Sequence, residues 1–216
     1  MASMQQYRHI IWDWNGTLFD DAWLCIEIIN GLLARRGLPL LDAARYQELF
    51  TFPVRNFYQA AGFDFASDPF EELAAEFTVE YDRRRFECGL QPGAHTALAA
   101  FAARGCDQSV LSAYEQTRLG EMIAYTGLHD NFRQLFGLDD HYSTSKVALG
   151  RRCIRELACP PEEALLIGDS LHDFDAAKAM GITCLLIPSG HYSHARLAQC
   201  GAPVVENLEG LLGEVA

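Results

Sequence analysis

The chain has 216 residues, half of them apolar, and 29 Asp and Glu outnumber 17 Lys and Arg to give a formal net charge of −12. So acidic a composition argues against nucleic acid as a partner, because binding it requires clustered positive charge. No segment reaches the roughly 18 consecutive apolar residues of a membrane span, and residues 1–8 lack the apolar run of a signal peptide.

Seven cysteines are scattered along the chain without any Cys-x-x-Cys pair. This spacing is typical of reduced thiols that fill space in a core, not of a metal site or a disulfide framework. We therefore expect a cytoplasmic protein with no membrane partner.

The first candidate site residue follows the first apolar run. Residues 10–12 are apolar and lead into the sequence DWNGT at residues 13–17. The run predicts a buried strand over 8–13 that carries Asp13 to its carboxyl end, where open α/β sheets bind their ligands. A carboxylate there can act as a nucleophile. Taken alone, Asp-x-Asn-Gly is equally compatible with an ordinary turn.

Residues 20–88 have the apolar spacing of helices and no convincing strand. Apolar side chains recur every three or four residues, and Gly and Pro interrupt the pattern. The helices are expected over 21–36, 42–50, 54–61 and 68–85.

From residue 92 onward, predicted helices and strands alternate. Helices are expected over 94–104, 115–126, 146–158 and 173–180 and at the C-terminus. Strands are expected over 108–112, 164–167, 182–187 and 203–205, with a loop over 132–136. This alternation is typical of a parallel, right-handed α/β sheet. We expect the strand over 8–13 to join that sheet, which makes 20–88 a helical insertion.

A second carboxylate follows a strand in the same way. Gly168 and Asp169 come directly after the apolar residues 165–167. Asp13 and Asp169 can therefore converge on one divalent cation, and Mg²⁺ prefers such oxygen ligands. Asp173, four residues on, can face back toward Lys146 or toward metal-bound water.

Ser112 and Lys146 are weaker candidates when each is taken alone. The Ser112 hydroxyl and the Ala113 N–H can hold a phosphoryl oxygen, although a serine after a strand is usually a cap or turn residue. Lys146 is one of only two lysines. It can neutralise a carboxylate and a phosphoryl oxygen, although most lysines are simply exposed on the surface.

Taken together and in this order, DWNGT at 13–17, Ser112, Lys146 and GDSLHD at 168–173 resemble the four motifs of the haloacid dehalogenase-like (HAD) superfamily. The resemblance is greatest to its phosphoglycolate-phosphatase-like members and covers essentially the whole chain. It implies a Rossmann-like α/β core of residues 1–19 and 89–216, and a C1-type helical cap domain of residues 20–88.

The resemblance also implies a role for each motif residue. Asp13 attacks phosphorus and forms an aspartyl-phosphate, while Ser112, Ala113 and Lys146 hold the phosphoryl oxygens. Mg²⁺ binds Asp13, the backbone carbonyl of Asn15 and Asp169, with Asp173 in support. The implied activity is that of a Mg²⁺-dependent phosphatase acting on a small phosphorylated metabolite.

Asn15 departs from the family pattern at a catalytic position that usually holds an aspartate. That aspartate protonates the leaving group and activates water, and an amide has no ionisable proton for either task. The backbone carbonyl survives as a metal ligand. Three interpretations stay open: a slow phosphatase, a phosphatase for good leaving groups, or a catalytically impaired HAD-like protein that binds a phosphorylated ligand or a protein partner.

Substrate choice is expected to depend on residues 20–88. Residues in connecting segments above a rigid core commonly set specificity, and the candidates are Asp20, Asp21, Arg55 and Tyr58. The insertion contains no lysine, which excludes a phosphonate-cleaving mechanism through a Schiff base in this cap.

Overall fold

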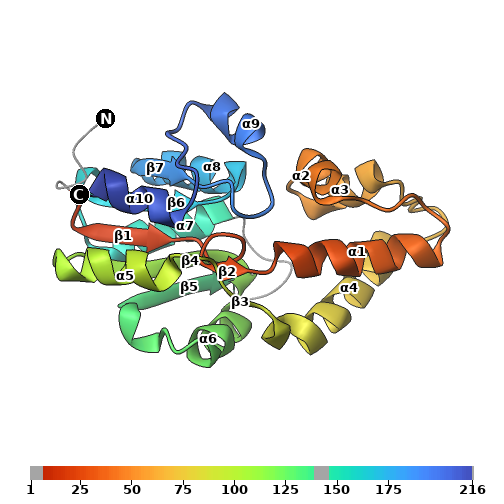
Figure 1. Ribbon diagram of the computed structural model, residues 1–216, viewed down its shortest axis with the longest axis horizontal. Helices are drawn as coiled ribbons and strands as arrows, with labels where there is room; N and C mark the ends of the chain where they lie inside the picture. The colour runs from red at the N-terminus through yellow and green to blue at the C-terminus, as the bar shows by residue number, and fades with distance from the viewer. Residues whose placement is uncertain (1–6, 139–145, 216) are drawn as a thin grey trace.

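A five-stranded parallel sheet forms the centre of the computed structural model, which describes residues 7–138 and 146–215 (Figure 1). In spatial order the strands are β5 (Gln134–Leu138), β4 (Asp107–Glu115), β1 (His9–Trp12), β6 (Ala164–Gly168) and β7 (Thr183–Leu186). The prediction of a parallel α/β sheet is confirmed, and the first strand of the chain lies at its centre.

Helices cover both faces of the sheet. In Figure 1, α5 and α10 lie in front of it and contact each other, whereas α7 and α8 pack together behind it. The helices that follow β3 are α5 (Ala94–Ala103), α6 (Gln116–Tyr125), α7 (Lys146–Leu157), α8 (Leu171–Met180), α9 (His194–Leu197) and α10 (Leu208–Val215). Such double coverage leaves only the ends of the strands open to ligands.

The two central strands, β1 and β6, are buried along their whole length. Parallel strands covered on both faces read as continuous apolar runs, as both of these do. The polar atoms in this layer are paired across to β4: Trp12 Nε1 donates to Gln108 Oε1 at 2.9 Å, and His9 Nε2 hydrogen-bonds Ser109 Oγ at 3.0 Å. On its other side β1 pairs with β6 in parallel as far as Trp12 and Ile167, so the carboxyl ends of β1 and β6 lie beside each other.

The structure differs from the sequence prediction at both edges of the sheet. The predicted loop over 132–136 is wrong, because β5 (Gln134–Leu138) forms an edge strand there. β5 contains Gly137, pairs only with β4 and is only partly buried, so it lacks the continuous apolar run of a central strand. The predicted strand over 203–205 is reduced to a single bridge between Val204 and Leu186.

The helical insertion begins and ends at a small antiparallel ladder. β2 (Phe19–Asp20) pairs with β3 (Gly89–Leu90). Between these strands lie α1 (Ala22–Arg35), α2 (Ala43–Leu49), α3 (Val54–Ala61) and α4 (Phe70–Arg84). Figure 1 shows these four helices to the right of the sheet, beyond the end where β1 leads into β2.

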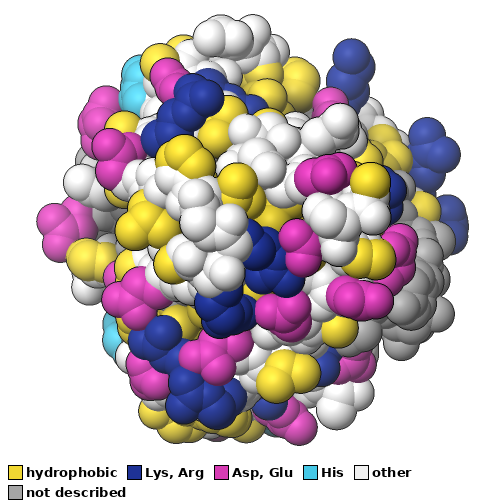
Figure 2. All heavy atoms as spheres, turned by 90° about the vertical axis from the view of Figure 1, so that its right-hand side faces the viewer, with side chains coloured by type: hydrophobic (Ala, Val, Ile, Leu, Met, Phe, Trp, Pro, Cys, Tyr) yellow, Lys and Arg dark blue, Asp and Glu magenta, His cyan; other side chains and the backbone are white. Residues whose placement is uncertain are grey.

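Figure 2 shows the end of the molecule formed by the insertion, where positive and negative side chains are interspersed. Arg35 and Arg36 both pair with Glu76 on this part of the chain. The described residues of this face therefore form no broad basic patch of the kind that binds nucleic acid. Among the described residues, none of the helices combines the length and apolar character needed to span a bilayer.

The core makes a direct prediction about stability. Leu166 lies in β6 and is completely buried, whereas Leu40 is 61% exposed. Leu166→Ala is expected to lower the free energy of unfolding by about 2–5 kcal/mol, because it removes buried apolar area and leaves a cavity. Urea denaturation measures this, with Leu40→Ala as the matched control, for which about 0.5 kcal/mol or less is expected. Equal losses would contradict the assignment of β6 to the centre of the core.

Candidate active site

Three buried carboxylates meet at the carboxyl edge of the sheet. Asp13 directly follows β1, and Asp169 directly follows β6, its neighbour. The backbone N–H of Asp13 donates to the carbonyl of Ile167 at 2.9 Å, which holds the two strand ends together. Carboxylate oxygens of Asp13, Asp169 and Asp173 all lie within 4.8 Å of one another. The structure thus brings together the carboxylates that the sequence placed at two strand ends and on a following helix.

Lys146, the first residue of α7, joins this group from the other side. Its buried ammonium pairs with Oδ1 of Asp13 and with Oδ1 of Asp173. The other oxygen of Asp173 closes a capping box at the start of α8, accepting hydrogen bonds from Ser170 N at 3.0 Å and Ser170 Oγ at 2.6 Å. The cap fixes the Asp173 carboxylate so that its free oxygen faces Lys146.

Burial and charge shift the pKa values of these groups. Burial lowers the pKa of Lys146, but Asp13 and Asp173 outweigh that effect and hold the pKa above its ordinary value, so the side chain stays charged. Burial, and then the charge of Asp173, raise the pKa of Asp13 well above its usual range against the opposing effect of Lys146. The same two causes raise the pKa of Asp169 to about 7.

The donor set fits a small divalent cation. Three carboxylates share one ammonium, and a divalent cation would stabilise their ionised forms. The donors are all oxygen atoms, which Mg²⁺ prefers. Glycine keeps the space around them tight: Gly16 has φ +79°, and a Cβ there would lie 2.5 Å from Asp169 Oδ2. A side chain at position 16 would therefore displace one of the candidate ligands.

Asn15 is held by its side-chain amide in a network with the first residues of the insertion. Its Nδ2 donates to Asp21 Oδ2 at 2.8 Å and to the Tyr81 hydroxyl at 3.0 Å. Tyr81 in turn donates to Asp21 Oδ2 at 2.6 Å, and Gly16 N donates to Asp21 Oδ1 at 3.0 Å. A carboxylate at position 15 would lose the donor and face the Asp21 carboxylate.

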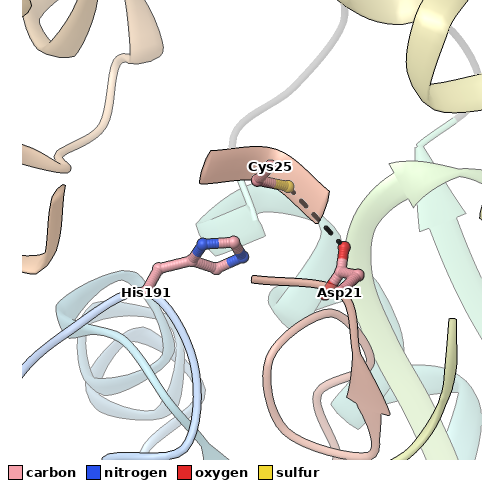
Figure 3. A group of neighbouring side chains, drawn as sticks. All are labelled: Asp21, Cys25 and His191. Carbon is pink, nitrogen blue, oxygen red and sulfur yellow. Dashed lines mark hydrogen bonds between the residues drawn. The ribbon is translucent and has the colours of Figure 1, made fainter. Parts of the chain in front are cut away.

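Figure 3 shows Asp21 and Cys25, at the start of α1, with the ring of His191 directed toward them from the loop after β7. The imidazole is fixed from behind, since its Nδ1 is 2.9 Å from the Tyr46 hydroxyl and Phe50 stacks on it at 4.5 Å. Burial lowers the pKa of His191 and raises that of Cys25 well above its usual range.

Asp21, Cys25 and His191 are better described as a polar wall than as a second metal site. Asp21 Oδ2 already accepts hydrogen bonds from three donors, Asn15 Nδ2, the Tyr81 hydroxyl and, at 4.0 Å, the Cys25 thiol. The thiol of Cys25 stays protonated near neutral pH. Cysteine binds a metal as the thiolate, and any ligand atom needs a free lone pair. The backbone N–H of His191 also donates to Asp169 Oδ2 at 2.6 Å, which ties this loop to the first carboxylate group.

Ser112 and Ala113 lie where β4 leaves its regular ladder. The pairing of β4 with β5 shifts register between Leu111 and Glu115, and β-bulges of this kind commonly redirect side chains beside active sites. Ser112 Oγ lies 3.5 Å from Asn15 Oδ1 and accepts a hydrogen bond from Tyr114 N at 3.1 Å. The predicted phosphate-holding segment is therefore beside the carboxylates.

A cavity of about 870 Å³ opens from this group toward the insertion. On the side of the core, the cavity is lined by Asp13, Asn15, Ser112, Ala113, Lys146 and Asp169. Of the predicted specificity residues, Asp21, Arg55 and Tyr58 also line it. Asp20 is not among the described lining residues, and its carboxylate accepts a long hydrogen bond of 3.4 Å from Gln91.

Two side chains of this site, Tyr81 and His191, were not predicted from the sequence. His191 offers one usable signal, because it follows a strand and a turn at the same edge of the sheet as Asp13. Tyr81 gives none, since its position on α4 has the spacing of an ordinary buried helical residue.

The fold and the strand-end carboxylates define an α/β protein with a candidate active site, and comparison with known proteins identifies its family. The family model described as haloacid dehalogenase-like hydrolase matches residues 10–187. The chain therefore belongs to the haloacid dehalogenase-like hydrolase family, which confirms the resemblance seen in the sequence.

Relatives of this chain include proteins named as phosphatases. A 5'-nucleotidase of Pseudomonas aeruginosa is 27% identical over 200 residues, covering 89% of this chain and 87% of that protein. A phosphoglycolate phosphatase of Rhodobacter capsulatus is 30% identical over 191 residues, covering 84% of each chain. A haloacid dehalogenase-like hydrolase from Streptococcus pneumoniae has the same fold, with a TM-score of 0.83 at 19% identity over 98% of this chain and 99% of that one.

The contact between Asn15 and Asp21 predicts a compensating pair of substitutions. Asn15→Asp is expected to lower the free energy of unfolding by about 1–3 kcal/mol, because it removes a donor and puts two carboxylates together in a buried place. Adding Asp21→Asn restores an amide-to-carboxylate hydrogen bond in the opposite direction and is expected to recover most of the loss.

Urea denaturation of both single variants and the double variant, in the presence of a chelator, measures this coupling. The chelator is needed because a bound cation would mask the repulsion. Additive losses in the double variant would show that the two side chains do not interact.

Proposed function

We propose that the protein is a Mg²⁺-dependent phosphomonoester hydrolase that works through an aspartyl-phosphate on Asp13. The observation that carries the proposal is the meeting of Asp13, Asp169 and Asp173 with the buried ammonium of Lys146, at one end of a large cavity. Membership of a hydrolase family with phosphatase relatives supports the reaction class.

The chemistry begins at the Asp13 carboxylate. One of its oxygens attacks phosphorus, the bond from phosphorus to the ester oxygen breaks, and the alcohol leaves with the bonding electrons and takes up a proton. Water then attacks phosphorus and gives up a proton to the solvent, the bond from phosphorus to the Asp13 oxygen breaks, and inorganic phosphate leaves with Asp13 regenerated as a carboxylate. Because positioning and charge stabilisation supply most of the catalysis in phosphoryl transfer, the main task of the site is to hold a charged group in line with Asp13.

Lys146 and Ser112 are proposed to bind the phosphoryl oxygens. Lys146 already touches Asp13, so its charge lies beside the nucleophile and the group under attack. The register shift of β4 between Leu111 and Glu115, and the presence of Ser112 and Ala113 in the cavity lining, support a contact from the Ser112 hydroxyl and the Ala113 backbone. Mg²⁺ would be held by Asp13, the Asn15 carbonyl and Asp169, where it supplies positive charge against the phosphoryl oxygens.

Asn15 is proposed to act as a positioning residue. Its amide is engaged with Asp21 and Tyr81 and has no proton to give the leaving alcohol. Esters with good leaving groups are therefore expected to react faster than alkyl esters of similar size. The alternative, a HAD-like protein that only binds a phosphorylated ligand or a protein partner, predicts no turnover even of p-nitrophenyl phosphate.

Residues 20–88 are proposed to be a cap over this site, with the substrate bound between cap and core. The cavity is lined from both parts, which supports this arrangement. Relatives named for phosphoglycolate and for 5'-nucleotides suggest a small phosphorylated metabolite. We place the enzyme in the cytoplasm, which the seven free cysteines, all within the described residues, support.

Asp13→Asn is expected to abolish turnover of p-nitrophenyl phosphate at saturating Mg²⁺, because the amide is a poor nucleophile. Asp107→Asn is the matched control: Asp107 begins β4, at the opposite end of the sheet from the site, and is exposed. Initial rates and circular dichroism of both variants test the assignment. A folded Asp13→Asn variant with a rate near that of the native protein would rule out Asp13 as the nucleophile.

Asp169→Ala is expected to weaken Mg²⁺ binding at least about tenfold, because the site loses one of its few protein ligands. Isothermal titration calorimetry with MgCl₂ measures this without reference to activity, and Asp107→Asn again serves as the control. Unchanged affinity in Asp169→Ala would place the cation elsewhere.

A further inference from the structure

The cavity is much larger than a phosphate and a two-carbon alcohol require. Its volume of about 870 Å³ lies toward the upper end of the roughly 300–1,000 Å³ of sites that enclose drug-sized ligands. It runs from the carboxylates at the sheet edge to α3 and α4 of the insertion. The part beyond the phosphate site is therefore available to the leaving group.

Aromatic rings from the insertion form much of this outer part. Phe52, Phe70 and Phe77 all line it and are only partly buried, so their faces or edges are open to a ligand. Side chains in a finished core are usually fully covered. Three incompletely covered rings around one cavity indicate a surface that a ligand completes.

The rings continue down to the polar end of the cavity. The Phe52 ring lies 4.6 Å from the ring of His172, which belongs to α8 of the core. On α4, Phe77 stacks with Tyr81 at 6.0 Å, and Tyr81 meets Tyr114 of β4 edge-on at 5.9 Å. Because Tyr81 also contacts Asn15, the aromatic lining reaches the place where the ester oxygen would lie.

The charges of the lining disfavour an anionic leaving group. Among the described residues that line the cavity, the only cationic side chains are Arg55, Arg118 and Lys146, and each is paired with a carboxylate. Arg118 pairs with Asp82 at 2.6 Å. Arg55 lies 3.5 Å from Glu71, with its guanidinium 4.5 Å from the centroid of the Phe65 ring.

The partners Glu71 and Asp82, together with Glu115, also line the cavity and add negative charge. A second anionic group on the substrate would have to share an arginine with one of these carboxylates and would be repelled by it. An uncharged group is not repelled by the carboxylates and does not compete for the arginines. Aromatic side chains bind it through apolar contact and stacking.

We infer that the preferred substrate is a phosphomonoester whose alcohol carries an uncharged, flat ring, bound in the outer part of the cavity beside Phe52 and Phe77. The inference rests on the proposed phosphatase activity and adds the chemical class of the leaving group. A simple aryl-alkyl alcohol and a nucleoside share this chemistry. Esters of small anionic alcohols such as glycolate are expected to bind poorly in this cavity.

The test compares phosphate esters that differ in the ring but not in the reacting alcohol. 2-Phenylethyl phosphate, adenosine 5'-monophosphate and butyl phosphate all release a primary alcohol, and phosphoglycolate adds a carboxylate. With Mg²⁺ held constant, kcat/KM for at least one ring-bearing ester is expected to exceed that for butyl phosphate about tenfold, and phosphoglycolate is expected to be the slowest. The two ring-bearing esters distinguish a nucleoside pocket from a general aryl pocket.

Variants assign the preference to the rings. Phe77→Leu and Phe52→Leu keep apolar volume but remove the flat face, and each is expected to reduce the ring preference about threefold to tenfold, mainly through KM, as loss of one stacking contact predicts. Phe86→Leu is the matched control, since Phe86 is 43% exposed, packs on Tyr125 and lies outside the lining. Two independent positions are used so that one poorly folded variant does not decide the result.

Equal kcat/KM for butyl and ring-bearing esters, or phosphoglycolate as the best substrate, would overturn the inference while leaving the phosphatase proposal intact. If both Phe77→Leu and Phe52→Leu keep the native preference for ring-bearing esters over butyl phosphate, these two rings are not what binds the leaving group. Absence of turnover of every ester, p-nitrophenyl phosphate included, would overturn the phosphatase proposal and this inference with it.

Discussion

The buried ion pairs of Lys146 are the contacts on which the rest of the site depends. An ammonium removed from water costs several kcal/mol, an amount recovered only when partners of opposite charge are held close. Asp13 and Asp173 provide that compensation, and they come from different elements, the end of β1 and the first turn of α8. Three segments far apart in the sequence therefore meet at one point. The charged groups there are buried and held in fixed positions. Such preorganised charge is what phosphoryl transfer needs.

A second network joins this centre to the helical insertion. Asp21, at the start of α1, receives hydrogen bonds from Asn15, Gly16 and Tyr81, and Tyr81 belongs to α4, the last helix of the insertion. Both ends of the insertion therefore contact the loop that follows the candidate nucleophile. The amide of Asn15 suits this network because it can donate to a carboxylate, whereas an aspartate in its place would be repelled. The same substitution that removes the family's acid/base thus stabilises the contact between insertion and core.

The sequence was informative where function depends on local pattern. Asp13 and Asp169 were found because each directly follows a buried apolar run, and central parallel strands give that signal clearly. β5 was missed because an edge strand with a glycine lacks the signal. Tyr81 and Phe77 give no such signal for another reason: their place in the cavity depends on how the insertion packs above the sheet, and no spacing within one helix encodes that contact. Local pattern located the carboxylates of the candidate site, whereas tertiary packing determines what surrounds them.

The binding energy that the aromatic cavity can provide is of the same order as the rate loss expected from an amide at position 15. Loss of a general acid or base costs about 10²–10⁴ in rate, equivalent to about 3–6 kcal/mol at about 1.4 kcal/mol per factor of ten. Burying a ring the size of a phenylalanine side chain provides about 1.5–3 kcal/mol, and each stacking contact adds about 0.5–1.5 kcal/mol. Binding energy from a part of the substrate that does not react can be used to orient the part that does. A ring-bearing alcohol held beside Phe52 and Phe77 would align its ester oxygen with Asp13 and recover much of what the amide at position 15 cannot supply.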